Sequence, residues 1–539
     1  MPRRDHYRVL DPENAPPPRH GRLRPTVYDP TRLLLRGLGG TQEDRRSQLR
    51  ERLAERGIEL PPQPAAGRRA RDPDERPARR GGPRRERPPQ QEEPDEPAEP
   101  SLAEALQDAP PAVRELAERL WVEPIRLPSG GRPEERPDAW EVLATLQREE
   151  PDLASQLSLD HLVRAAPEGR SGTGWRPHPY WGVHPYWGTH PYWGAHGDPS
   201  EHYGQPGFGG RVPVHWHGPD PAHRNGHETG AGRRSPVVAV ADTGLGAHPW
   251  FTSGVQRDRT FHGLPIGGDD CDLDPASCLD RTGLLQGASG HGTFIAGLIR
   301  QTCPEATVMP VPVLHADGFV DEVQLHQALV LLLLRHVEGQ LTDRPDQLID
   351  VLSLSLGFYH ETPEDTVAST ALRDLMDAYG DAGVAVVAAA GNDCTDDPLL
   401  PAGFAGQQVG LQHARVPLVS VGALNPDGDS VAWFSNTGDW VSCFRVGAAL
   451  VSTVPTTMRG GQQPAVRTIG ADHTRATLDP DDYSCGFATW SGTSFAAPVV
   501  AGALAAHLAG RDDTAETGRD ECATRGWEAV HAELEWTRP

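Results

Sequence analysis

Lysine is absent from the 539-residue sequence, and all 51 of its basic residues are arginine. We attribute this bias to genomic base composition rather than to function. Acidic residues outnumber basic ones, 75 to 51, so the net charge is −24. The excess acid lies after residue 100, where 57 acidic residues stand against 29 arginines. Nucleic-acid binding needs basic patches that neutralise phosphates, so we expect no nucleic-acid partner.

Long hydrophobic runs are missing as well. The longest, ALVLLLL at 328–334, is far shorter than the about 20 apolar residues that span a bilayer, so we expect no membrane partner. The N-terminus is charged and proline-rich, without the apolar core of a secretory signal. Cysteine is absent before residue 271, and the seven that follow are an odd number. We expect reduced thiols in a cytoplasmic protein. Export by another route stays open, and Cys271 and Cys278 could then close a small loop.

Residues 1–100 consist mainly of arginine, proline, glutamate and glycine. The stretch 67–100 has too little apolar surface to offset the entropy cost of ordering it. We therefore expect residues 1–100 to be a disordered region. RLLLRG and a short helix at 43–57 are the local exceptions.

Residues 101–168 have the pattern of a small α or α/β domain. Ser101 with Glu104, and Asp138 with Glu141, form capping-box patterns that mark helix starts. Apolar spacing predicts two helices, and two further runs read as strands that flank the second helix. These segments are 112–121 and 138–150 for the helices, and 122–128 and 156–166 for the strands.

An HPYWG repeat fills residues 178–195 and places four histidines six residues apart, at 178, 184, 190 and 196. Imidazole is a common metal ligand, but the repeat lacks carboxylates and thiols, and each of the first three histidines precedes a proline. We interpret residues 169–208 as a linker, either a plain tether or one whose Tyr-Trp pairs dock on a groove.

Residues 209–511 read as one globular α/β domain. Continuous apolar runs such as PVVAVADTG (236–244) and VAVVAAAGN (384–392) alternate with amphipathic helical segments. This alternation indicates a parallel sheet covered by helices on both faces, so the run at 328–334 belongs to a core helix. Residues 512–539 read as a polar C-terminal tail with one further helix.

Four polar residues stand at predicted strand ends or helix starts, where such sheets place their sites. Asp242 and Asn392 end strands, whereas His291 and Ser494 begin helices. We predict that His291 takes the proton of the Ser494 hydroxyl, that Asp242 orients the imidazole, and that Asn392 and the Ser494 N–H bind an oxyanion. Asp-Thr-Gly is also an aspartic-protease pattern, but its single copy would require a homodimer.

The chain resembles the subtilisin-like serine proteases (subtilases) in the segments VADTGLGAHPWF, GHGTFIAGLI, VLSLSLG, AAAGN, LPAGFAG with VSVGAL, and GTSFAAPVVAG. These span about 236 to 510 and carry the chain order Asp, His, Ser. The resemblance implies a serine endopeptidase with a subtilisin-like α/β fold, acting on protein or peptide substrates without a cofactor. It also implies that an extended peptide pairs with an edge at Ser355, Leu356 and Gly357. One wall of the specificity pocket would be Ala388, Ala389, Ala390 and Gly391.

Three departures from the family pattern stand out. Phe294 replaces a second histidine outside the triad, no secretory signal is seen, and an acidic insertion fills 267–280. Calcium prefers carboxylate oxygens, but the insertion matches no binding loop, so we expect a solvated loop and no metal site.

Residues 101–168 occupy the place of a propeptide, which in such enzymes assists folding and blocks the cleft; an unrelated accessory domain is the alternative. A catalytically silent, protease-like binding protein is the alternative to an endopeptidase. The oligomeric state stays undetermined.

Overall fold

The computed structural model describes eleven stretches of the chain, namely residues 6–19, 21–38, 40–62, 100–128, 136–165, 203, 210–216, 218–224, 233–362, 371–407 and 415–535. The HPYWG repeat, and residues 67–99 of the stretch expected to be disordered, lie outside the described residues.

The centre of the molecule is a six-stranded sheet in which every pairing is parallel. Its strands are nearly all buried, which explains why they read as continuous apolar runs. The prediction of a parallel α/β sheet is therefore confirmed. In spatial order the strands are β16 (Cys443–Val446), β15 (Val419–Leu424), β13 (Ala385–Ala389), β11 (Val351–Leu354), β6 (Val237–Asp242) and β9 (Thr307–Pro312).

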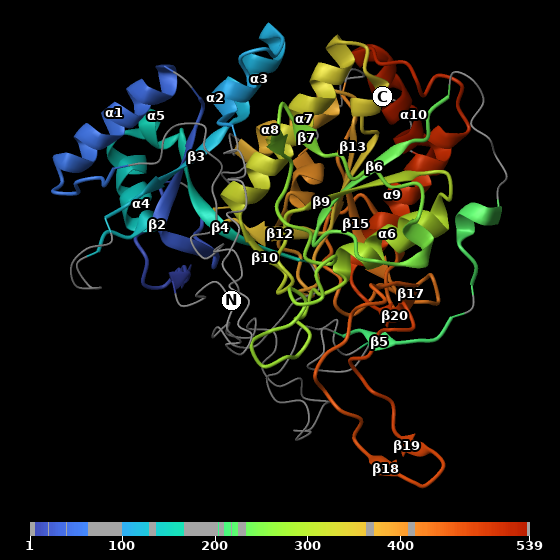
Figure 1. Ribbon diagram of the computed structural model, residues 1–539. Helices are drawn as coiled ribbons and strands as arrows, with labels where there is room; N and C mark the ends of the chain where they lie inside the picture. Colours follow the sequence, from blue (N-terminus) through green and yellow to red (C-terminus); the bar gives the residue numbers. More distant parts are fainter. Residues whose placement is uncertain are drawn as a thin grey trace, which may run out of the picture.

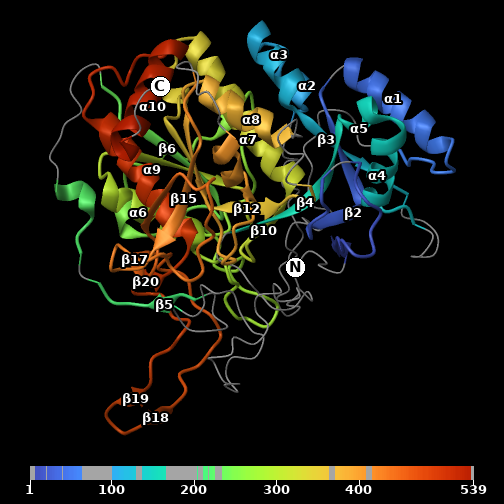
Figure 2. The same ribbon diagram turned by 180° about the vertical axis from the view of Figure 1, so that it is seen from behind.

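Helices cover both faces of this sheet (Figures 1 and 2). Val238 and Val240 of β6 belong to one apolar cluster, whereas Ala239 and Ala241 belong to a second, as the two-residue period of a strand requires. The first cluster contains α6 and α9, and the second contains α7 and α8. These helices span His291–Thr302 (α6), Thr493–Ala509 (α9), Glu322–Leu341 (α7) and Ala371–Asp381 (α8).

The apolar run at 328–334 lies inside α7 and is entirely buried, as predicted. In the part of the chain that the structure describes, no helix has the length and apolar character to cross a membrane.

The C-terminal residues expected to form a tail fold onto the sheet domain instead. Helix α10 (Arg519–Leu534) packs on α9 and buries Trp527 and Val530. Most of its polar residues are exposed, whereas Arg525 is buried and donates to the carbonyl oxygens of Asp513 and Glu516.

A smaller antiparallel unit precedes the sheet domain. As predicted, two strands and a helix between them form: β3 (Val122–Arg126), α4 (Ala139–Glu149) and β4 (Leu157–Ala165). The unit also contains β1 (Arg8–Val9), β2 (Val27–Arg36), α1 (Gly40–Ala54), α2 (Leu102–Ala105), α3 (Pro111–Leu120) and α5 (Pro151–Ala154).

The expectation of a disordered region over residues 1–100 is too broad, and its two named exceptions, RLLLRG and the helix at 43–57, overlap with β2 and α1. Leu33 and Leu35 of β2 pack with Leu49 and Leu53 of α1 in one cluster, and all four side chains are fully buried. Spaced leucines create this apolar face although the surrounding composition is polar.

Strand β4 connects the two units. Beyond β2, it pairs antiparallel with β12 (Leu356–Tyr359) and with β10 (Phe319–Asp321). The resulting sheet runs β1-β2-β4-β12-β14, with β14 at Leu399–Leu400. The N-terminal unit therefore continues directly into the edge of the sheet domain (Figure 1).

Short strands complete the described fold. A hairpin of β18 and β19 projects from the body (Figure 1). The short strands are β5 (Val212–Pro213), β7 (Thr260–Phe261), β8 (Leu264–Pro265), β17 (Leu450–Thr453), β18 (Arg467–Ile469), β19 (Thr474–Ala476) and β20 (Phe487–Trp490).

Candidate active site

Asp242 and His291 meet at the carboxyl end of the parallel sheet. Asp242 is the last residue of β6, and His291 is the first residue of α6. The carboxylate Oδ1 lies 2.7 Å from imidazole Nδ1, and both side chains are buried. Gly290, which precedes the helix, has φ 81°, a conformation that glycine adopts without strain. The Asp-His pair predicted from the sequence is therefore brought together.

Asp272 holds the first turn of α6 from the acidic insertion. Its carboxylate accepts hydrogen bonds from the Gly290 N–H at 3.0 Å, the Thr293 N–H at 3.1 Å and the Thr293 hydroxyl at 2.6 Å. Burial raises the pKa of Asp272, and the negative charge of Asp242 adds to the rise. The expectation of a solvated loop is wrong for this residue, because helix N-terminal N–H groups need acceptors. Sequence reasoning missed Asp272, although five carboxylates in the insertion were a signal.

Ser494 is the second residue of α9 and is fully buried. Its hydroxyl donates to the Ser355 carbonyl oxygen at 3.3 Å, and the Ser355 hydroxyl donates to the Ser494 carbonyl oxygen at 2.9 Å. His291 Nε2 is buried and has no hydrogen-bond partner among the described residues. The rings of His291 and Phe495 lie 5.2 Å apart, so the two helix starts are neighbours. A Ser494–His291 hydrogen bond is not formed in this state, and such bonds often tighten only with substrate.

Asn392 follows β13 and presents its amide toward the same place. Its Oδ1 accepts from the Thr493 N–H and the Thr493 hydroxyl, both at 2.9 Å. These bonds orient the amide and leave Nδ2, which is buried, without a partner among the described residues. An unpaired buried donor is costly and calls for an explanation. A transient acceptor such as an oxyanion supplies one.

The predicted pocket wall lies at the end of β13. Ala388 and Ala389 are strand residues, Ala390 and Gly391 follow, and all four are buried. Gly391 has φ 107°, and a Cβ there would lie 2.5 Å from Asn436 Nδ2. Asn436 in turn donates to the Ala390 carbonyl oxygen at 3.0 Å. A larger residue at 391 would therefore displace this support.

The predicted peptide-binding edge is paired with an extended strand, but that strand is β4 of the same chain. Ala165 lies opposite Leu356, and Arg164 lies opposite Gly357. On its other side, the Ala165 N–H donates to the Gly318 carbonyl oxygen at 2.7 Å. The end of β4 is thus a central strand between two strands of the sheet domain.

His161 of β4 connects the two units through charge. Its Nδ1 lies 2.5 Å from Glu322, and its Nε2 lies 2.8 Å from Glu361. Burial alone would lower the pKa of His161, but the two carboxylates outweigh it and raise the pKa to about 10. Burial likewise opposes ionisation of Glu361, yet His360 and His161 lower its pKa to about 2. Sequence reasoning missed this cluster because its members are far apart in the chain.

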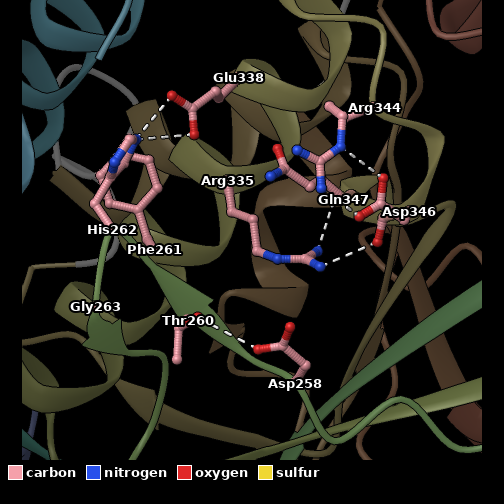
Figure 3. A pocket seen from close by; sticks show the side chains of 10 residues that line it. All are labelled: Asp258, Thr260, Phe261, His262, Gly263, Arg335, Glu338, Arg344, Asp346 and Gln347. Carbon is pink, nitrogen blue, oxygen red and sulfur yellow. Dashed lines mark hydrogen bonds and ion pairs between the residues drawn. The ribbon is translucent and has the colours of Figure 1, made fainter. Parts of the chain in front are cut away.

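A separate surface hollow of about 250 Å³ lies beside β7 and the end of α7. His262 contacts Glu338, and Arg335 donates to the carbonyl oxygens of Asp346 and Gln347 (Figure 3). None of the four residues predicted to be catalytic lines it. Most of its ionisable groups pair with one another, as His262 does with Glu338 and Arg344 with Asp346.

An intracellular serine protease of Paenibacillus polymyxa is 28% identical over 282 residues, which cover 50% of this chain and 66% of that protein. The serine protease AprX of Bacillus subtilis is 27% identical over 311 residues, covering 52% and 58%. The chain thus spans less than two thirds of these relatives. A solved cold adapted subtilisin-like serine proteinase is 22% identical, with a TM-score of 0.34, covering 57% of this chain and 86% of that one.

The sequence profile of the subtilase family (Peptidase_S8) matches residues 233–525, which is more than half of the chain. The match includes Asp242, His291, Asn392 and Ser494, and it extends into α10, the helix first interpreted as part of a tail. By this match, the chain belongs to the subtilase family.

Proposed function

We propose that the protein is a serine endopeptidase whose nucleophile is Ser494 and whose base is His291. One observation carries the proposal. The Asp242 carboxylate engages His291 Nδ1 at 2.7 Å, while His291 Nε2 and Asn392 Nδ2 are buried without partners beside the start of α9. A proton acceptor and an oxyanion donor are therefore both available near the Ser494 hydroxyl.

The chemistry follows from these positions. The Ser494 oxygen attacks the carbonyl carbon of a peptide bond while His291 Nε2 takes the hydroxyl proton. The resulting oxyanion accepts hydrogen bonds from Asn392 Nδ2 and the Ser494 N–H. His291 then protonates the leaving amine, and the acyl group stays on Ser494 until water, activated by the same imidazole, releases it. Asp242 stabilises the imidazolium throughout.

The N-terminal unit is proposed to be a propeptide-like inhibitor. The end of β4 occupies the edge at Leu356 and Gly357 where an extended substrate would pair. Substrate and β4 therefore compete, and the full chain is expected to be less active than a chain whose N-terminal region has been cleaved. Ser355, and the wall from Ala388 to Gly391, are proposed to contact the substrate once β4 has left.

Labelling with a fluorophosphonate probe tests the proposal. The probe reacts with an activated serine, so wild-type protein should label at Ser494, and more strongly after limited cleavage within residues 1–200. Ser494→Ala should not label, whereas Ser442→Ala, which alters a serine away from the site, should label like wild type.

The alternative function makes the opposite prediction. A catalytically silent, protease-like binding protein would leave the wild type unlabelled even after its N-terminal region has been removed. That result would contradict the endopeptidase proposal. Labelling that is equal before and after cleavage would contradict only the inhibitory role of the N-terminal unit.

A further inference from the structure

Four ionisable side chains gather where β4 meets the sheet domain. His161 lies on β4, Glu322 is the first residue of α7, and His360 and Glu361 directly follow β12. The side chains of His161, Glu322 and Glu361 are 1%, 7% and 4% exposed, and that of His360 is 11% exposed. His161, Glu322 and Glu361 thus come from three distant parts of the chain and are buried together. His360 lies beside them and is half-buried.

The geometry of the cluster is that of metal ligands with an outer partner. One ring nitrogen each of His161 and His360 and one oxygen of Glu361 lie within 4.8 Å of one another. His161 Nε2 already lies 2.8 Å from Glu361 Oε2. Its other nitrogen, Nδ1, is held by the Glu322 carboxylate at 2.5 Å. A carboxylate on the far nitrogen of a histidine is the usual outer support of a metal-bound imidazole.

We propose that His161, His360 and Glu361 form a zinc site that ties β4 to the sheet domain. Two imidazoles and one carboxylate suit zinc, whereas calcium and magnesium prefer oxygen ligands alone. Zinc would bind the neutral imidazoles of His161 and His360. Its binding would displace into solvent the proton that His161 Nε2 shares with Glu361 Oε2. The two glutamates then balance the charge of the ion, and water completes a tetrahedron. Zinc holds such ligand atoms about 3.3 Å apart, so small side-chain rotations close the site.

A hydrogen-bonded ion cluster without metal is the competing explanation. In that case the four side chains hold one another without an ion: His360 Nδ1 lies 3.6 Å from Glu361 Oε2 and accepts a hydrogen bond from the Thr362 N–H at 3.1 Å. The contribution of His360 to zinc binding therefore separates the two explanations. His360 is also the least buried of the set, so its replacement leaves the fold least affected.

The consequence for function rests on the inhibitory role proposed for the N-terminal unit. His161 lies three residues before Arg164, which is paired with Gly357 at the substrate-binding edge. Zinc bound at this point would resist the departure of β4 from the edge. With zinc bound, β4 would therefore stay paired with the sheet domain. Removal of zinc would let the N-terminal unit dissociate more readily.

Zinc titration of the full-length Ser494→Ala chain, which cannot cleave itself, tests the site. After treatment with a chelator, calorimetry should show one tight zinc ion per chain. Adding His360→Ala should weaken this binding at least about 10-fold, and Glu322→Gln should weaken it by roughly 10- to 100-fold as an outer partner. Cobalt in place of zinc should give the visible absorption of a tetrahedral ion, which His360→Ala should abolish.

Two controls exclude other zinc ligands. The repeat histidines at 178, 184, 190 and 196 bind metal incidentally, so all four are replaced by alanine in the parent chain. His326→Gln alters another buried histidine, one that contacts the Leu120 carbonyl oxygen, and should bind zinc like the parent.

Hydrogen exchange supplies a readout that does not need activity. Zinc should slow exchange of the backbone N–H groups of 157–165 in the parent chain and not in His360→Ala. Zinc binding that is absent, or equal in the parent and in His360→Ala, would overturn the proposal. In another outcome, zinc binds tightly and protects β4 while fluorophosphonate labelling of the Ser494-containing chain stays unchanged. That outcome supports the zinc site and contradicts only the inhibitory role of the N-terminal unit.

Discussion

Two fully buried histidines mark two regions of the molecule, and they are paired in opposite ways. His291, in the parallel-sheet domain, has Asp242 on Nδ1 and no partner on Nε2 among the described residues. His161, in the N-terminal unit, has a carboxylate on each nitrogen. A general base needs an open nitrogen, whereas a doubly paired ring is held in place. Pairing, rather than burial, therefore distinguishes the proposed base His291 from His161, which contacts both units.

Carboxylates differ between the two regions in the same way. Arg32 of the N-terminal unit contacts Asp29 at 2.5 Å, Asp160 at 3.3 Å and Asp321 at 2.6 Å. Beside His291, Asp272 instead accepts its hydrogen bonds from backbone N–H groups and a threonine hydroxyl. The contact between the units therefore depends on ion pairs, whereas the start of α6 beside His291 depends on neutral donors.

The largest effect is expected from Asn392, whose buried Nδ2 has no partner among the described residues. The test uses a protein whose N-terminal region has been cleaved. In it, Asn392→Ala should lower kcat by about 10²- to 10³-fold with little change in KM, because the amide would act only in the transition state. Peptide hydrolysis measures both constants. Asn425→Ala, in the turn after β15, is the control and should leave both unchanged. A rise in KM at constant kcat would contradict the oxyanion role.

A smaller effect is expected where β4 meets the substrate edge. Ala165→Pro removes the N–H that donates to the Gly318 carbonyl oxygen, and a lost hydrogen bond of ordinary strength corresponds to roughly 3- to 10-fold. Peptidase activity of the uncleaved chain should therefore rise by about this factor. Ala165→Gly keeps the N–H and serves as the control. Equal activity of the two variants would mean that β4 does not compete with substrate.

The smallest effect concerns stability near the reactive region. Burial, followed by the charge of Asp272, raises the pKa of Asp270 to about 6. Between pH 4 and 6 the folded chain thus binds more protons at this group than the unfolded chain, so its contribution to stability falls as pH rises. Asp270→Asn cannot titrate and should gain roughly 2 kcal/mol relative to the parent over that interval.

Urea unfolding of the Ser494→Ala chain with and without Asp270→Asn measures this difference. Asparagine keeps an acceptor for the Leu245 N–H, which donates to Asp270 at 3.0 Å. A difference in unfolding free energy that stays constant between pH 4 and 7 would show that folding does not raise the pKa of Asp270.

The parallel sheet and its polar strand ends were predictable from the sequence because their signals are local. A strand buried on both faces must be apolar throughout, so Asp242 and Asn392 stand out at the ends of β6 and β13. Gly290 before His291, and Gly492 two residues before Ser494, mark the helix starts in the same local way. Because the strands are parallel, Asp242 and Asn392 lie at the same end of the sheet.

The contacts between the units were not predictable in this way. His161, Glu322 and Glu361 come together only through the antiparallel pairing of β4 with β10 and with β12, which no local pattern encodes. Within residues 1–100, the leucines of RLLLRG and of 43–57 were visible, but the pairing of β2 with β3 and β4 was not. Asp272 was misjudged because an acidic loop usually faces solvent, whereas here a helix start needed an acceptor.

Replacement of the two contrasted histidines in the full chain tests the account most directly, with peptide hydrolysis as the measurement. His291→Ala should lower activity by at least about 10⁴-fold, because the open nitrogen is the proposed base. His161→Gln should instead raise activity, because it loosens the attachment of β4. Activity that survives His291→Ala, or that falls to the same extent in both variants, would contradict the assignment of reactive and holding roles.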